Sequence, residues 1–139
     1  MRRIMKRAAT SLATTAAIGM MFVGPASVAS AESGVDLGST ATLVAKGAAV
    51  LVPVNVTCGD TMFPSTSFTM VTVKERSSKR IVQGNGSANV ICDGMPQTVE
   101  VLVMAQDAPF KPGTALATAS VFSCGPGCGP DTAEIRIRH

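Results

Sequence analysis

The chain has 139 residues, a formal net charge of +3 and hydrophobic residues at 46% of its positions, while only 15% of its residues are charged. This length holds one domain rather than two, and the low charged fraction excludes a charge-rich disordered tail. Four Cys, one His and the lack of Trp and Tyr restrict the chemistry that the side chains can supply.

Residues 1–31 indicate a secretory signal peptide. Four basic residues stand within the first seven, an apolar run covers residues 8–23, and Ala29-Ser30-Ala31 supplies the small residues of a cleavage site. The alternative is a membrane anchor, but the run is shorter than the ~20 residues that span a bilayer. We therefore expect a protein that is secreted after cleavage near Ala31, without a stable membrane anchor.

The mature chain, residues 32–139, has 108 residues and is expected to form one domain. It keeps eight of the twelve Lys and Arg and all nine Asp and Glu, so its formal net charge is −1. The basic excess of the whole chain belongs to the signal peptide. The net charge therefore gives no reason to expect a nucleic acid or another polyanionic partner.

The four cysteines of the mature chain suggest two disulfides. An even number of Cys in a small exported chain indicates bridges, and four Cys allow three pairings. Cys124 and Cys128 flank Gly-Pro-Gly, a turn-forming stretch, which leaves Cys58 to pair with Cys92. The alternative, a Cys₄ zinc site, lacks the usual ligand spacing, so no metal is expected.

Apolar residues recur at every second position through most of the mature chain, and this period is typical of β-strands. Turn-forming clusters separate the runs about every ten residues, which favours an antiparallel β-sandwich of about seven strands. The expected strands lie near residues 41–43, 50–58, 68–73, 80–92, 99–103, 115–121 and 133–137.

Two stretches leave alternatives open. The alanines of residues 115–119 favour a strand because they alternate with Thr and Ser, with a helix as the other interpretation. Residues 80–92 are expected to form one bent strand with a bulge at Gly84–Gly86. If Asn85-Gly86 forms a tight hairpin instead, Cys58 and Cys92 end at opposite poles and their bridge is strained.

Three segments carry a resemblance to a known family: Val52–Cys58, Val90–Gly94 and Phe110–Ala115. They resemble small secreted immunoglobulin-like proteins of actinobacteria, many of which have no assigned function. The likeness covers most of residues 37–124 and implies an immunoglobulin-like β-sandwich. It implies no activity.

A weaker resemblance is to the apoproteins of the neocarzinostatin type, secreted seven-strand sandwiches that carry an enediyne chromophore. The shared features are the size, an exported chain rich in Ala, Val, Thr and Gly, and two disulfides of which one closes a short C-terminal loop. The second disulfide loop of that family is also short, whereas Cys58 and Cys92 lie far apart. No binding residue is carried over.

No catalytic residues are expected. The one histidine of the mature chain is His139, the last residue, so a Ser-His-Asp or Cys-His arrangement has no base within the domain. Asp93 and Asp131 border turns, where a carboxylate commonly accepts bonds from the local backbone. The densest basic stretch, residues 74–80, is interpreted as a solvated hairpin end, with contact to an anionic wall polymer or lipid as the alternative.

The phenylalanines suggest one candidate ligand cleft. Phe68 and Phe122 are expected in the core, whereas Phe63 and Phe110 stand in loops beside Pro64 and Pro109. We therefore predict a secreted, non-enzymatic binding or structural module without a cofactor, whose partner is unknown: a cell-surface or a small-molecule ligand. The alternative is a small-molecule carrier with a cleft near Phe63 and Phe110; an enzyme or enzyme inhibitor is the third class.

Overall fold

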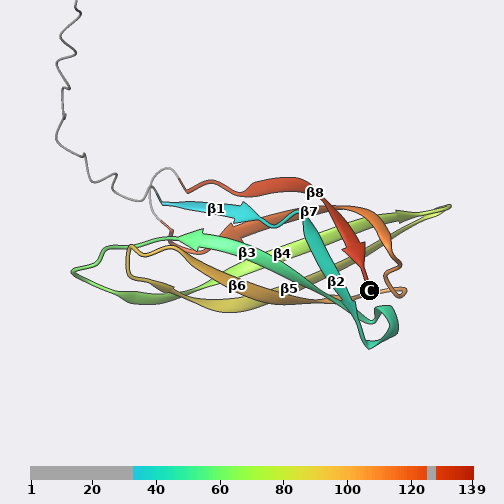
Figure 1. The fold of residues 1–139 in the computed structure, drawn as a ribbon, viewed down its shortest axis with the longest axis horizontal. Helices are drawn as coiled ribbons and strands as arrows, with labels where there is room; N and C mark the ends of the chain where they lie inside the picture. The colour runs from blue at the N-terminus through green and yellow to red at the C-terminus, as the bar shows by residue number, and fades with distance from the viewer. Residues whose placement is uncertain (1–32, 125–127) are drawn as a thin grey trace, which may run out of the picture.

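Eight β-strands account for most of residues 33–124 and 128–139, which are the residues that the computed structural model describes (Figure 1). The predicted signal peptide and its cleavage site lie outside them. One 3₁₀ turn, η1, covers Ala45–Gly47. The strands are β1 (Gly34–Leu37), β2 (Thr40–Val44), β3 (Ala49–Thr57), β4 (Ser65–Ser77), β5 (Arg80–Cys92), β6 (Gln97–Ala105), β7 (Gly113–Val121) and β8 (Asp131–Arg138).

The all-β prediction is confirmed, and the period of two explains which side chains form the core. The valines of β3 at positions 50, 52, 54 and 56 are all buried, and in β7 the buried residues are Ala115, Ala117 and Ala119. The small alanines allow β7 to lie in the middle of the sheet, between β4 and β8. The sequence missed β1, a four-residue strand that pairs with the second half of β3.

The strands close into a barrel rather than remaining two separate sheets. The hydrogen-bonded order β1-β3-β2-β8-β7-β4-β5-β6 is joined end to end because β3 also pairs with β6 over eight residue pairs. Seven strands thus form a closed ring, and β1 adds to the edge of β3. The predicted sandwich is corrected in this respect, since alternation fixes the faces of a strand but leaves open which edges pair.

The narrowest seam of the ring joins β5 to β6 through two residue pairs, Gly84 with Ala105 and Asn85 with Met104. Close approach here requires glycine. A Cβ at Gly86 would collide with the carbonyl oxygen of Leu102. The single strand predicted over residues 80–92 is confirmed, but the predicted bulge is wrong, because β4 and β5 pair one to one along thirteen residue pairs.

Both predicted disulfides are confirmed. Cys58 and Cys92 are buried, and their bridge joins the residue after β3 to the end of β5 with a Cα–Cα distance of 4.6 Å. Cys124 pairs with Cys128 across the β7–β8 connection. Both bridges therefore fasten connections at the same end of the barrel.

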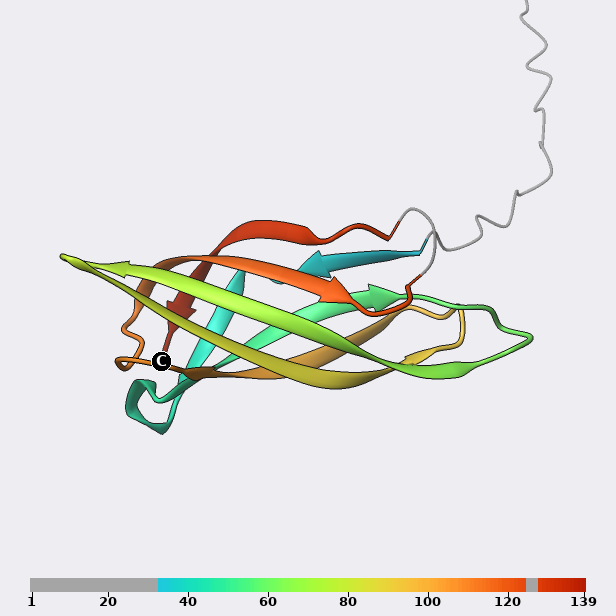
Figure 2. The same ribbon diagram turned by 180° about the vertical axis from the view of Figure 1, so that it is seen from behind.

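The connections alternate between two ends of an elongated barrel (Figures 1 and 2). The β3–β4, β5–β6 and β7–β8 connections share one end with the start of β1. The β2–β3, β4–β5 and β6–β7 connections share the opposite end with the C-terminus. In the part of the chain that the structure describes, no helix is long and apolar enough to cross a membrane.

Candidate functional site

Every Lys and Arg of the described residues lies at or near the end that holds the C-terminus, which we call the basic end. All eight side chains are exposed. Three acids, Glu75, Asp107 and Glu134, lie at the same level, which leaves a local formal charge of +5; the other five described acids lie toward the opposite end. The eight residues are Lys46, Lys74, Arg76, Lys79, Arg80, Lys111, Arg136 and Arg138.

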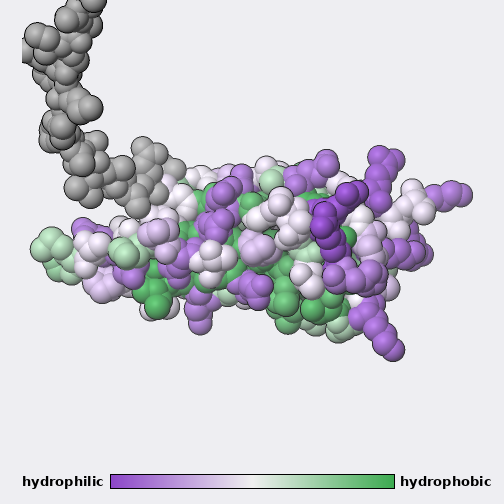
Figure 3. Space-filling model, viewed as in Figure 1, coloured by the Kyte–Doolittle hydropathy of each residue, from purple (hydrophilic) through white to green (hydrophobic). Residues whose placement is uncertain are grey.

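Sequence reasoning missed this separation because it considered the net charge and the single basic stretch 74–80, and not which connections of the chain share an end. A signal was nevertheless present, since the bases fall in or beside alternate connections of the chain. Successive antiparallel strands run in opposite directions, so alternate connections meet at one end. Figure 3 shows the outcome: strongly hydrophilic side chains project from the basic end, on the right of the view.

The β4–β5 hairpin contributes half of the basic end. Ser77 pairs with Arg80, so Ser78 and Lys79 form a two-residue turn at the tip. Ser78 has a φ of +50°, a conformation in which a side chain is strained. Open hollows of about 470 and 490 Å³ lie along the hairpin and share Ser78, Lys79 and Arg80 in their linings.

A buried carboxylate ties this hairpin to the β6–β7 connection. Glu75 is only 5% exposed, and its Oε2 accepts a hydrogen bond of 2.9 Å from the backbone N–H of Lys111. The bond fixes the loop that carries Lys111 against the base of the hairpin. Glu75 therefore positions part of the basic end from inside the barrel.

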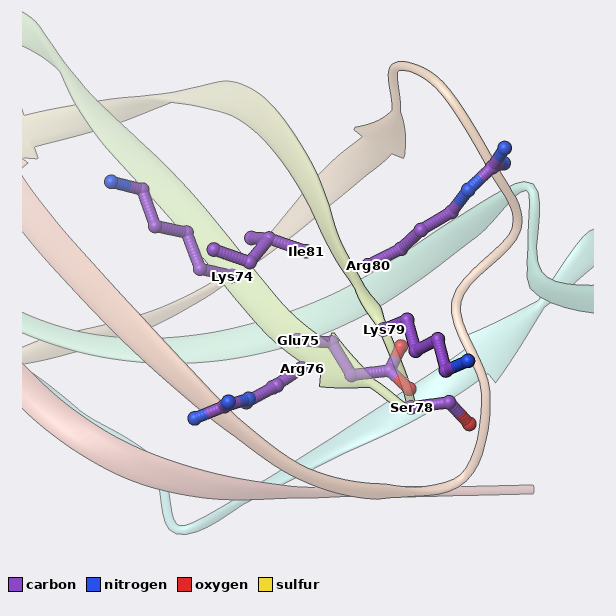
Figure 4. A pocket seen from close by; sticks show the side chains of 7 residues that line it. All are labelled: Lys74, Glu75, Arg76, Ser78, Lys79, Arg80 and Ile81. Atoms are coloured by element: carbon purple, nitrogen blue, oxygen red, sulfur yellow. The ribbon is translucent and has the colours of Figure 1, made fainter.

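The charged groups of the hairpin do not converge on one point. Lys74 and Arg76 extend to one side of the hairpin, and Arg80 extends in the opposite direction (Figure 4). Lys79 and Ser78 project at the tip, on the side of Glu75. This arrangement spreads positive charge over a surface and does not build a pocket around a single small anion.

The opposite end carries exposed apolar residues on two tightly held turns. The backbone N–H of Met62 donates to Oδ1 of Asp60 (2.8 Å), and that of Met95 donates to Oδ1 of Asp93 (2.9 Å). The Asp93 bond confirms the expectation of a local turn contact. The N–H of Gly94 also donates to the carbonyl oxygen of Cys58 (2.8 Å), so the two turns support each other beside the Cys58–Cys92 bridge.

Asp131 does not make the local turn contact that the sequence predicts for it. Its Oδ2 accepts a bond of 2.8 Å from the N–H of Leu37, a residue of β1 that is distant in the sequence. The carboxylate therefore joins β1 to the start of β8 rather than capping its own turn. Sequence patterns do not predict this contact, because they do not predict β1.

The structure does not bring together Phe63 and Phe110, the residues of the predicted cleft. Phe63 is 77% exposed in the β3–β4 connection, whereas Phe110 is 2% exposed in the β6–β7 connection at the basic end. The N–H of Phe110 donates to the carbonyl oxygen of Gly47 (2.8 Å), and its ring lies beside Gly84. Phe110 therefore fills the end of the core.

Phe68 and Phe122 were expected in the core, and this prediction is wrong. Phe122 is 63% exposed and follows β7, while Phe68 is 37% exposed on the outward register of β4. Their rings stack with centroids 5.3 Å apart and planes 6° apart. Each ring covers part of the other, which reduces the apolar area that two separate exposed rings would leave in water.

No group of three or more His, Cys, Asp or Glu within residues 33–124 and 128–139 is placed to hold a metal ion. His139 is exposed beside Arg138, in a shallow hollow at the C-terminus. No family model matches the chain, and a search of curated proteins finds no match either.

Proposed function

We propose that this protein is an exported, non-enzymatic binding module that meets its partner at the basic end. The observation that carries the proposal is the separation of charge, with eight exposed cations at one end of a disulfide-bonded barrel. A local excess of one sign raises the concentration of oppositely charged partners and speeds their association. The two disulfides support export, because such bridges persist in oxidising compartments.

The proposal includes an immunoglobulin-like arrangement of the strands. If the narrow β5–β6 seam and the short strand β2 are set aside, the remaining pairings fall into two groups. These are β1-β3-β6 and β8-β7-β4-β5, and the grouping supports the proposal, because an immunoglobulin-like sandwich is likewise built from two antiparallel sheets of three or more strands. The Cys58–Cys92 disulfide departs from the immunoglobulin pattern, because it joins the ends of β3 and β5. The resemblance to actinobacterial secreted proteins rests on the sequence segments alone.

The binding proposal is tested with the mature chain, residues 32–139, and cell envelopes of the producing organism. The double variant Lys79→Gln/Arg80→Gln removes two positive charges from the hairpin tip. Its matched control, Thr66→Glu/Asn89→Glu, makes the same net change at exposed positions nearer the other end. We expect retention on sedimented envelopes to fall for the first variant only. Equal retention of wild type and both variants would refute binding through the basic end.

The alternative function, a small-molecule carrier of the enediyne-apoprotein kind, is tested by a separate experiment. Its predicted cleft has no support in the geometry, since Phe63 and Phe110 lie at opposite ends. Native mass spectrometry of protein purified from culture medium separates the two proposals. The binding module predicts the mass of the 108-residue chain less four hydrogens, and a copurified small molecule favours the carrier. The same mass tests cleavage after Ala31 and both disulfides.

A further inference from the structure

We infer that the ligand of the basic end is a flexible, base-free polyanion with regularly repeating negative groups, of the kind that forms anionic polymers at a cell surface. This inference rests on the proposed binding function and names the partner. It follows from three features of the basic end: how the charges are spread, which side chains accompany them, and how the connections are shaped.

The cations are distributed around the rim of the barrel. Lys46 lies in η1 between β2 and β3, Lys111 precedes β7, and Lys79 stands at the tip of the β4–β5 hairpin. Arg136 and Arg138 lie on β8, where their strand partners are Thr40 and Thr42 of β2. A single small anion can touch only one of these groups at a time, whereas a chain with repeating charges can contact several.

Flexibility of the ligand follows from the same distribution. Duplex DNA has a persistence length of about 150 base pairs, so it would lie along one side of a rim of this size. A flexible polyanion can bend around the rim and reach cations on several connections. Each contact releases a counterion from the polymer, and this release supplies the binding free energy.

The side chains that accompany the cations disfavour nucleobases and sugar rings. Binding of single-stranded nucleic acid relies on aromatic side chains on which bases stack. The chain contains no Trp or Tyr, and Phe110, the phenylalanine at this end, is buried. The exposed phenylalanines lie toward the opposite end, where they cannot assist. Recognition here therefore depends on the charged backbone of the polymer.

The shape of the connections disfavours a bilayer as the ligand. Stable attachment to an anionic membrane usually combines basic residues with apolar side chains that enter the lipid. Ser78 and Lys79 form the hairpin turn, and Ala45–Gly47 forms the β2–β3 turn, so neither turn offers a large apolar side chain. Ile81 is an exposed apolar side chain of the β4–β5 hairpin, but it lies on the strand behind the tip and not in the turn. Met62, Phe63 and Met95 could enter a bilayer, but they lie at the other end.

The test titrates the mature protein with fluorescently labelled poly(glycerol phosphate) at several salt concentrations. A flexible single-stranded polyanion shows a slope of log K against log salt of about −0.7 for each phosphate contact. Six to eight contacts predict a slope of about −4 to −6, which corresponds to a loss of affinity of roughly 300-fold or more between about 50 and 200 mM salt.

Two variants test whether the cations of the basic end cause this salt dependence. Lys79→Gln/Arg80→Gln removes two contacts and is expected to make the slope less steep by about 1.4. The matched control Thr66→Glu/Asn89→Glu is expected to keep the wild-type slope, because both positions lie away from the rim. Circular dichroism of each variant checks that the fold is retained.

Three further probes decide the class of ligand. Glycerol phosphate monomer, duplex DNA with the same number of phosphates, and vesicles containing anionic lipid are all expected to bind more weakly than the polymer. Stronger binding of any of these, or a slope near zero for the polymer, overturns the inference. If envelopes still require Lys79 and Arg80 while the polymer does not bind, the binding module stands and only its proposed ligand is wrong.

Discussion

Replacing Gly86 with Ala tests the closure of the barrel. Gly86 lies in β5 where that strand approaches β6, and a Cβ added there would lie 2.8 Å from the carbonyl carbon and still closer to the carbonyl oxygen of Leu102. It would also lie 3.0 Å from the Cα of Val103. These are backbone atoms of the neighbouring strand, so the collision is relieved only if the two strands separate.

The sign of the change in stability distinguishes the closed barrel from two open sheets. Overpacking costs about 1–3 kcal/mol, and backbone neighbours place this variant toward the upper part of that range. In an open sheet edge the same change would stabilise the strand by roughly 0.5–1 kcal/mol, because alanine loses less conformational freedom than glycine on folding. The closed barrel therefore predicts a net loss of about 1–2 kcal/mol for Gly86→Ala.

The assay is urea unfolding of the mature chain, followed by far-ultraviolet circular dichroism. Urea slopes of ~1–3 kcal/mol/M convert the predicted loss into a fall of about 1 M in the midpoint. Gly129→Ala is the control, because a Cβ there meets nothing within 4 Å. The reasoning is refuted if Gly86→Ala unfolds at the same midpoint as the control, or at a higher one.

Three further predictions test the fold. Changing Cys58 and Cys92 to Ala should lower the free energy of unfolding by roughly 3–4 kcal/mol in urea titration, because their bridge closes a 34-residue separation; a loss below about 1 kcal/mol would contradict this. Phe110→Ala should lower the free energy of unfolding by about 3–5 kcal/mol in the same assay, whereas Phe63→Ala should change it by no more than about 0.5 kcal/mol. Equal losses would contradict the burial of Phe110 and the exposure of Phe63. Ser78→Gly should stabilise the fold by up to about 1 kcal/mol and so raise the melting temperature slightly, because glycine relieves the strain of a φ of +50°. A lower melting temperature would argue against the strained turn.

Local patterns were sufficient for seven of the eight strands and for the disulfides. Valines at every second position placed one face of β3 in the core, and the same register carried Cys58 inward. A Gly-Pro-Gly stretch between Cys124 and Cys128 favoured their pairing, and Cys58 and Cys92 were then the two cysteines that remained to form the second bridge. These are short-range properties, since the period of a strand and the reach of a turn depend on neighbouring residues.

The candidate site was harder to predict, because it depends on where side chains point and which loops meet. Phe63 and Phe110 look alike in the sequence, each in a loop beside a proline, yet one is exposed and the other fills the core. Phe68 falls within a strand but occupies its outward register. Burial of a loop residue depends on the segments that pack on it, here Gly47 and Gly84, and these are remote in the sequence.

The sequence by itself determined an all-β chain, its buried faces and two disulfides, and it showed that the basic excess lies in the predicted signal peptide. The tertiary structure decided the closure between β3 and β6 and the gathering of cations at one end. The net charge counts all charges regardless of where they lie, whereas the local electrostatic field depends on which connections share an end of the barrel. A near-neutral chain whose strands alternate in direction can therefore build a basic surface that its total charge conceals.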